Sequence, residues 1–306
     1  MALPLIFDRR LLRARRRRGL RLGPETFLLD RVAEDFADRL RVVLRRFDLA
    51  ADIGTPTAAV RAAIVRDGAV GAVIALDPMI DAPGHLSGDH AANPAMHVVA
   101  DEEALPFANG ALDLVVSGLV LQAVNDLPGV LVQIRRVLKP DGLFLAALLG
   151  GDTLAELRQS LATAESELEG GASPRVAPFP DVRDMGGLLQ RAGFALPVTD
   201  ADRVTVRYAT PFALLRDLRR MGATNPLAER RRVPLRRTTL MRAMEVYAAR
   251  FADPDGKVRA SFDIIWLSGW SPHQDQQQPL RPGSAKARLA DALGTTEIAA
   301  GEKPDR

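Results

Sequence analysis

The stretch Leu49-Ala50-Ala51-Asp52-Ile53-Gly54-Thr55-Pro56-Thr57 decides the fold. A short apolar run ends on an acid and a glycine, and a helical pattern from Pro56 to Asp67 follows at once. This order is typical of a buried parallel strand that turns directly into a helix. The sequence therefore predicts the first strand and helix of a doubly wound sheet, in which ligands bind at the carboxyl ends of the strands.

Further apolar runs extend this pattern along the chain, each bounded by Asp, Gly or Pro. They predict strands at Val73 to Leu76, Met96 to Ala100, Leu112 to Ser117 and Leu143 to Leu149. A helical pattern from Leu127 to Leu138 separates the last two of these runs. Alternation of strands and helices is typical of the α/β class, so we predict a doubly wound α/β fold.

The flanking segments predict helices before and after this alternation. An apolar i, i+4 stripe predicts a helix over about 25–46, and Thr153 with Glu156 predicts a capping box for the helix after the fifth strand. Strands are expected at 196–199, 203–208 and, antiparallel, at 262–267, with two helices inserted before the last strand. We divide the chain into a basic N-terminal segment and helix (1–47), an α/β core (48–210), a helical insertion (211–257), a last core strand (258–270) and a flexible tail (271–306).

Charge is unevenly distributed in this chain of 306 residues, although the net charge is only +3. Residues 1–46 hold 13 arginines against 6 acids, and residues 203–242 hold 11 against 2. Such segments either form a solvated face or meet an anionic partner, such as a membrane surface, a nucleic acid or an acidic protein. No apolar run approaches the roughly 20 residues that span a bilayer, so we expect a cytoplasmic protein, with peripheral membrane contact as an open alternative.

Composition and spacing also limit the chemistry. The absence of cysteine excludes disulfides, Cys-ligated metals and thiol catalysis. His85 and His90 lie in a loop with Asp81 and Asp89, but this loop lacks rigid ligand spacing and we predict no metal site. Ser117 has no histidine nearby in the sequence, which gives no support to a hydrolase triad.

Acidic residues end three successive predicted strands: Asp52, Asp77 and Asp101 with Glu102. A carboxylate after the second strand can accept both ribose hydroxyls of a nucleoside, and an acid after the third can meet an adenine amino group. Any one of these acids alone is more often a solvated strand end. Together they favour a nucleoside site.

The chain resembles the methyltransferase-like assembly factors of respiratory complex I over nearly its whole length. The motifs that carry the resemblance occur in family order: Phe7-Asp8-Arg9, Ala100-Asp101-Glu102-Glu103, Leu105-Pro106-Phe107, Asp113 to Ser117, Val124-Asn125-Asp126-Leu127-Pro128, Leu138 to Gly142, Gly150-Gly151-Asp152-Thr153-Leu154, Glu169-Gly170-Gly171, Arg191 to Phe194, Met221-Gly222 and Ser268-Gly269-Trp270. The Gly-Gly-Asp-Thr-Leu block is the most specific of them. A more distant resemblance is to the carrier-protein methyltransferase of biotin synthesis.

The resemblance implies a Rossmann-like class I S-adenosylmethionine-dependent methyltransferase sheet with an antiparallel last strand and an inserted helical element. It implies that the protein methylates or hydroxylates an arginine of a complex I subunit. That subunit would be the protein partner. The cofactor-binding residues that we assign are Asp52, Gly54, Asp77, Pro78, Asp101, Glu102 and Ser117. The residues that we assign to substrate or partner are Asn125, Gly150, Gly151, Asp152 and Arg158, and no catalytic side chain is assigned.

Two departures from the family pattern bear on function. Thr55-Pro56-Thr57 replaces the usual glycine-rich turn, and Gln122-Ala123 replaces a His-Trp pair. Side chains at the turn and the missing N–H of proline would weaken or abolish cofactor binding. A non-catalytic assembly factor is therefore the alternative function. A nucleic-acid modifier is a third reading, and the lack of aromatics between the arginines argues against it.

Overall fold

The computed structural model describes residues 5–79, 96–276, 291 and 293–296. The candidate metal loop with His85 and His90, and most of the tail, lie outside these residues. The chain divides into a unit Met1–Pro272 and a unit His273–Arg306. The first unit contains all of the following elements: α1 (Arg9–Arg21), α2 (Phe27–Arg41), β1 (Phe47–Ile53), α3 (Ala59–Arg66), β2 (Val70–Leu76), β3 (Met96–Val98), β4 (Leu112–Gly118), η1 (Leu121–Ala123), α4 (Leu127–Val137), β5 (Leu138–Gly150), α5 (Ala155–Glu169), α6 (Val182–Arg191), β6 (Ala195–Tyr208), α7 (Pro211–Arg220), α8 (Arg237–Phe251) and β7 (Val258–Trp270).

The sheet has seven strands in the order β3-β2-β1-β4-β5-β7-β6. Strands β1 to β5 pair in parallel, and β7 runs antiparallel to both of its neighbours, β5 and β6. This confirms the predicted doubly wound sheet with an antiparallel last strand. The strand order reverses between β1 and β4, and a ligand in this kind of sheet binds beyond the carboxyl ends of the strands at that reversal.

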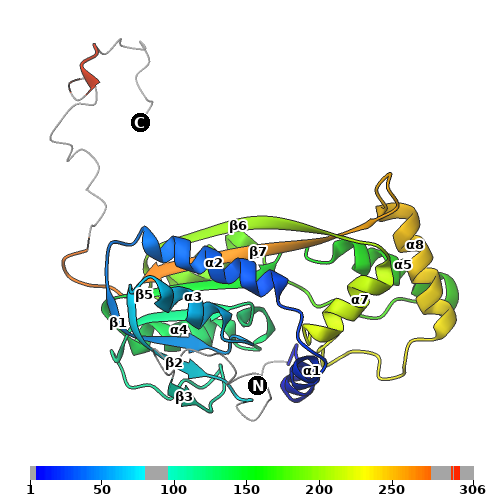
Figure 1. The fold of residues 1–306 in the computed structure, drawn as a ribbon, viewed down its shortest axis with the longest axis horizontal. Helices are drawn as coiled ribbons and strands as arrows, with labels where there is room; N and C mark the ends of the chain where they lie inside the picture. Colours follow the sequence, from blue (N-terminus) through cyan, green and yellow to red (C-terminus); the bar gives the residue numbers. More distant parts are fainter. Residues whose placement is uncertain (1–4, 80–95, 277–290, 292, 297–306) are drawn as a thin grey trace, which may run out of the picture. The chain divides into compact units, whose positions relative to one another are not determined.

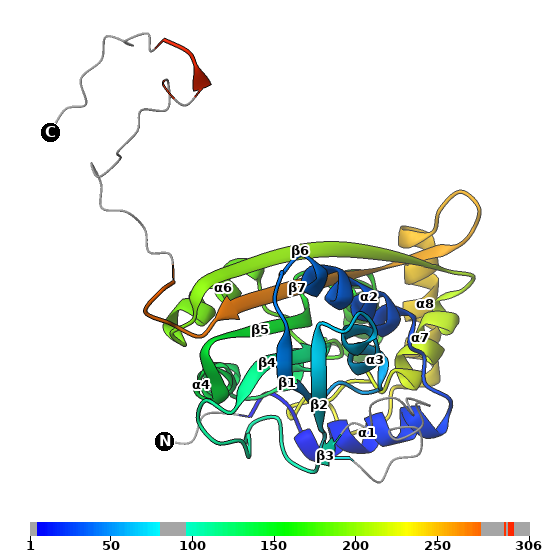
Figure 2. The ribbon, with the colours of Figure 1, turned by 60° about the vertical axis from the view of Figure 1, so that its left-hand side comes forward.

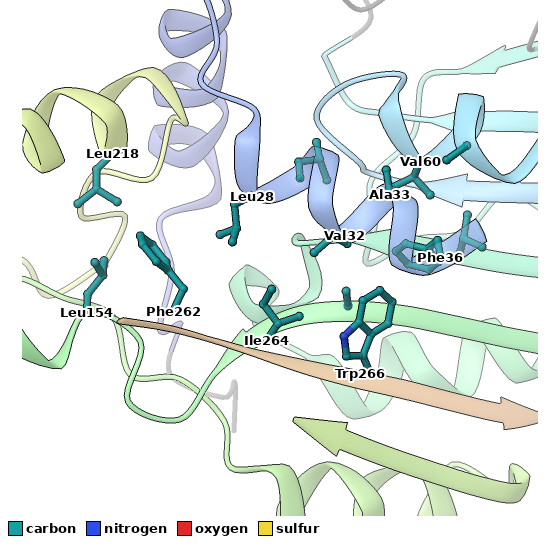
Figure 3. Packing of buried hydrophobic residues seen from close by; sticks show 14 of the residues in the cluster. Leu28, Val32, Ala33, Phe36, Val60, Leu154, Leu218, Phe262, Ile264 and Trp266 are labelled. Atoms are coloured by element: carbon teal, nitrogen blue, oxygen red, sulfur yellow. The ribbon is translucent and has the colours of Figure 1, made fainter. Parts of the chain in front are cut away.

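Helices cover both faces of the sheet (Figure 1). The core between α2, α3 and the sheet includes Phe36 and Trp266, whose rings lie 5.0 Å apart in an edge-to-face arrangement. Figure 3 shows Leu28 and Val32 on the same side of α2, toward Ile264 of β7. A second core holds α4 and α6 against the opposite face. Burial on both faces explains why the central strands read as continuous apolar runs.

Strands β6 and β7 are longer than predicted and carry the helical insertion (Figure 2). The two strands that we predicted at 196–199 and 203–208 form one strand, because β6 pairs with β7 along its length through the polar residues between them. The inserted helix α8 packs mainly on α5. The insertion therefore extends the α2 side of the core.

Helix α1 was not predicted, since within the basic segment and helix at 1–47 we expected a helix only over about 25–46. Asp8 caps the helix by accepting the Leu11 N–H at 2.9 Å. The helix packs on α7, below which it lies in Figure 1. Contact between them is close, because a Cβ on Gly222 would lie 2.7 Å from the Cα of Arg16. The two cationic segments of the sequence therefore meet.

The turn between β5 and α5 also differs from prediction. Thr153 and Glu156 form no capping box, because Leu154 takes a left-handed conformation (φ 56°) and breaks the cap geometry. The Thr153 hydroxyl instead donates to the Gly150 carbonyl at 2.7 Å, and Glu156 accepts the Ser261 hydroxyl at 2.6 Å. The first bond closes the turn, and the second fastens α5 to β7.

Candidate cofactor and substrate site

Three of the predicted acids lie at the carboxyl ends of adjacent strands. Asp52 ends β1, Asp77 follows β2 and Glu102 follows β3, and all three are buried. Gly54 lies among them with a φ of +71°. A Cβ on Gly54 would lie 2.7 Å from the Glu102 Cγ, so both the backbone conformation and the space require glycine. The sequence placed these residues correctly at one edge of the sheet.

Asp52 is held by side chains of its own turn and of α3. The Thr55 hydroxyl donates to one carboxylate oxygen, and Arg61 Nη1 lies 3.3 Å from the other. Burial raises the pKa of Asp52, and Arg61 opposes that shift. Thr55 itself is buried and also accepts the Gly118 N–H at 3.0 Å. Its side chain therefore points into the protein, which corrects the expectation that it obstructs the ligand.

Asp77 is fixed at the end of β2 by backbone hydrogen bonds. Its Oδ1 accepts the Met79 N–H at 2.7 Å, and its own N–H donates to the Val98 carbonyl at 3.1 Å. Burial raises its pKa to about 6. An acid with this pKa is largely ionised at neutral pH, and an ionised carboxylate is the stronger acceptor for hydroxyl groups.

Arginines of α1 reach the acids that follow β3, which the sequence did not predict. Arg9 binds both Asp101, at 2.6 Å, and Glu102, and Arg13 binds Asp101. Arg16 Nη1 lies 3.4 Å from Glu102 Oε1. These side chains come from the most basic part of the sequence. The Phe7-Asp8-Arg9 motif was the only sequence signal in this region.

The net electrostatic effect differs between these groups. Burial raises the pKa of Asp101, but the Glu103 N–H, Arg9 and Arg13 together lower it below its usual range. Burial lowers the pKa of Arg16, and Glu102 and Asp77 partly offset the shift. Asp101 is therefore stabilised as a carboxylate by α1.

A cavity of about 160 Å³ opens from the β1 turn toward α7. Its wall includes Pro56 and Thr57 of the turn, Met79 after β2, Arg16 of α1 and Leu218 of α7. Most of the surface is apolar, and Glu25 is the acidic residue among the described residues that line it. Such an apolar cleft with a few polar groups is typical of a small-molecule or side-chain site.

The other residues that we assigned to the cofactor or substrate make contacts within the described part of the chain. Ser117 is buried and donates to the Ile53 carbonyl at 2.8 Å, and Pro78 is half-buried next to Asp77. Asn125 accepts the Phe7 N–H at 2.8 Å. It therefore anchors the segment before α1.

The Gly-Gly-Asp-Thr block joins β5, β6 and β7. A Cβ on Gly150 would overlap Ile265, and Gly151 has a φ of +51°. Asp152 lies 3.3 Å from Arg203 and donates its N–H to Asp263. Arg158 of α5 donates to the Thr153 carbonyl at 3.3 Å. In this structure the block is a junction of strands beside the cavity.

Gln122, which stands where the family carries histidine, lines the cavity together with Ala123. Its side chain donates to the Leu119 carbonyl at 2.7 Å and accepts the Leu149 N–H at 3.4 Å. It therefore ties the end of β4 to β5. No group of metal-ligating side chains occurs among the residues that the structure describes.

Similarity of the sequence to known proteins assigns this chain to a family. Residues 51–146 match the methyltransferase domain model. Human arginine-hydroxylase NDUFAF5, mitochondrial, is 41% identical over 94% of this chain and 83% of its own length. The chain belongs to the NDUFAF5 family. This confirms the resemblance to methyltransferase-like complex I assembly factors within the class I superfamily. A malonyl-[acyl-carrier protein] O-methyltransferase of Xylella fastidiosa is 36% identical over 72% of this chain and 73% of its own length.

Solved structures support the fold of this NDUFAF5-family chain. The YcgJ protein of Bacillus subtilis superposes with a TM-score of 0.53 over 78% of this chain and 98% of its own, at 13% sequence identity. That similarity concerns the fold alone. In the described part of the chain, no helix has the length and apolarity needed to cross a membrane.

Proposed function

We propose that this chain binds S-adenosylmethionine and modifies an arginine of a respiratory complex I subunit, by methylation or hydroxylation, during assembly of that complex. The observation that carries the proposal is the set of buried acids around Gly54 at the ends of β1, β2 and β3. The relatives named arginine-hydroxylase NDUFAF5 support the reaction and the substrate residue.

The residues at this edge fit the cofactor. Gly54 lets Glu102 pack closely against the β1 turn, and Asp77 offers a carboxylate for the two ribose hydroxyls. Asp101 and Glu102 are the acids for the adenine end, and Arg9, Arg13 and Arg16 hold them in place. When bound, the cofactor supplies an electrophilic methyl group. The protein's own contribution is to orient the two reactants and to exclude water.

The cavity also suits an arginine side chain. Glu25 is the carboxylate on its wall, and Arg220 of this chain lies 3.1 Å from it. A substrate guanidinium that entered the cavity would replace Arg220 on Glu25, while the apolar wall would contact its methylene groups. Glu25 is thus a positioning residue for the substrate.

A non-catalytic assembly factor is the second candidate. The observation in its favour is that Pro56 and Thr57 line the cavity where glycines are usual in the family. Proline offers no N–H to a ligand, and threonine adds a side chain at the point of closest approach.

Titration calorimetry with S-adenosylmethionine separates the two candidates. Binding at micromolar affinity, with loss in Asp77→Ala, supports the enzyme. Mass spectrometry of a complex I subunit from cells with and without the protein then distinguishes an added methyl group from an added oxygen atom. No binding by a folded protein, together with capture of that subunit, supports the assembly factor. Cytoplasmic location and contact with an anionic surface stay predictions that cell fractionation tests.

A further inference from the structure

A second cavity, of about 440 Å³, has a wall dominated by arginines. Arg15 of α1, Arg175 before α6, and Arg230, Arg231 and Arg232 before α8 line it. Asp8 is the acidic residue among its described lining residues. We call this cavity the arginine basin.

The basin forms where the two cationic segments of the sequence meet. Phe7 and Leu227 form an isolated antiparallel bridge, and the Asp8 N–H donates to the Pro226 carbonyl at 2.8 Å. This pairing brings the start of α1 against the loop that carries Arg230 to Arg232. Residues that are more than 200 positions apart in the chain thus build one cationic surface.

Three of the five arginines are neutralised by carboxylates. Arg175 lies 2.5 Å from Glu165, Arg230 lies 3.2 Å from Asp8, and Arg231 binds Glu169. Among the described residues, no carboxylate forms an ion pair with the other two arginines, Arg15 and Arg232.

Arg15 is the more unusual of the two unpaired cations. Its Nη1 is buried and has no hydrogen-bond partner in the described part of the chain. Burial lowers the pKa of Arg15, and repulsion from Arg230 and Arg18 adds to that shift. A buried donor without a partner destabilises the folded protein, so a ligand that accepts from it binds favourably.

The basin leads toward the apolar cavity at the cofactor end. A third cavity, of about 210 Å³, shares Arg175 and Asn225 with the basin. It also shares Leu154 and Phe179 with the cavity that reaches Pro56. One elongated ligand can therefore place an anionic group in the basin and one of its own side chains near the β1 turn.

We propose that the arginine basin binds an acidic segment of the protein substrate, next to the residue that enters the apolar cavity. The identity of the substrate as a protein rests on the proposed function. Guanidinium groups bind carboxylates through paired hydrogen bonds, and Arg15 and Arg232 have such bonds to offer. No aromatic side chain occurs among the described residues that line the basin, which disfavours stacking of nucleic-acid bases.

The test uses a fluorescent peptide that alternates glutamate with glycine, and the same peptide with glutamine in place of glutamate. We expect the full-length protein to bind the glutamate peptide in preference, with an affinity that falls as salt rises. Arg15→Gln combined with Arg232→Gln should weaken binding roughly ten-fold or more, because charge-assisted hydrogen bonds are lost. Arg46→Gln, which changes an exposed arginine elsewhere, is the matched control.

Melting temperature separates a binding role from a structural one. The double variant should melt close to the wild type, since no carboxylate of the described residues forms an ion pair with Arg15 or Arg232. Equal binding of both peptides, equal weakening in Arg46→Gln, or tighter binding of single-stranded RNA or inorganic phosphate than of the glutamate peptide would overturn the proposal. Titration of the wild-type protein with S-adenosylmethionine distinguishes the two proposals. If the protein binds the glutamate peptide but not the cofactor, the proposed function is refuted and the basin remains a docking surface.

Discussion

Arg16 of α1 and Glu102 after β3 lie 3.4 Å apart, from Nη1 to Oε1, although 86 positions separate them in the chain. Both side chains are almost fully buried. Arg9 binds the same carboxylate, so Glu102 joins two turns of α1 to the ligand end of the sheet. The basic N-terminal helix is therefore a wall of the candidate site rather than a solvated appendage.

Loss of the Arg16 side chain should destabilise the fold. Arg16→Met leaves Glu102 with Arg9 alone, and removal of one partner from a buried ion pair costs about 3 kcal/mol at the lower end of measured values. Urea denaturation measures the change. Arg46→Met is the control, because Arg46 and Asp48 are exposed and such pairs contribute about 0–1 kcal/mol. Equal loss in both variants would contradict a special role for Arg16.

Asp77 should make stability depend on pH in a defined window. Burial raises its pKa from 3.8 to about 6. The Met79 N–H, Arg16 and Arg61 lower the pKa, but by less, and the negative charge of Glu102 adds to the rise. The folded state therefore binds a proton more tightly than the unfolded state, and the free energy of unfolding falls as pH rises through this window and is constant above it. Asp77→Asn should remove the fall, worth about 3 kcal/mol at most, in paired denaturation curves at about pH 4 and pH 7.

The same carboxylate should control cofactor affinity. Ribose hydroxyls donate to the ionised form of Asp77, so binding of S-adenosylmethionine should strengthen as pH rises through about 6 and then level off. Asp77→Asn should weaken binding at neutral pH by about 1.5–3 kcal/mol and lose the pH dependence. Calorimetry at several pH values measures both effects. A pH dependence that persists in the variant would show that another group titrates.

Sequence patterns predicted the parallel core because each of its strands is identified by neighbouring residues in the chain. Continuous apolar runs such as Leu112 to Ser117 identify strands that are buried on both faces, and the acids that follow them mark the ligand edge. The apolar run at 262–267 and the motif resemblance both predicted the antiparallel last strand, and the structure confirms it.

The missed features depend on contacts between distant segments. Helix α1 has only a narrow apolar stripe, with Leu12 buried, and its arginines are explained by acids that lie about 90 positions away. The capping box failed because Glu156 bonds to Ser261 of β7, which no local pattern reveals. The inward orientation of Thr55 likewise depends on Gly118 at the end of β4.

The Gly-Gly-Asp-Thr block should prove more important for stability than for chemistry. The Thr153 hydroxyl donates to the Gly150 carbonyl at 2.7 Å and accepts the Asp263 N–H at 2.9 Å in a fully buried position. Thr153→Val should lower the free energy of unfolding by about 1–3 kcal/mol, because a buried N–H loses its acceptor. Asp152→Asn is the control, since the Asp152 side chain is 70% exposed. A larger loss in the control would place the main contribution in the Asp152 ion pair.

The β1 turn allows a direct test of whether its side chains obstruct the cofactor. Thr55 is buried away from the cavity, whereas Pro56 and Thr57 line it. Thr55→Gly should therefore leave the affinity for S-adenosylmethionine unchanged and lower the free energy of unfolding by about 2 kcal/mol, because Asp52 and the Gly118 N–H both lose a partner. Thr55→Ser retains the hydroxyl and should retain the stability.

Pro56→Ala combined with Thr57→Gly should have the opposite effect on binding. A backbone N–H returns at position 56 and a side chain leaves the cavity wall, so affinity should rise about ten-fold, as expected for one hydrogen bond to a charged group. Stability should fall by about 0.4–1 kcal/mol per residue, because proline and threonine restrict the unfolded chain more than their replacements. Calorimetry and thermal melting of the same samples measure both changes. If the wild type already binds at micromolar affinity and the double variant binds no better, the turn holds the ligand without glycine and the non-catalytic reading loses its support.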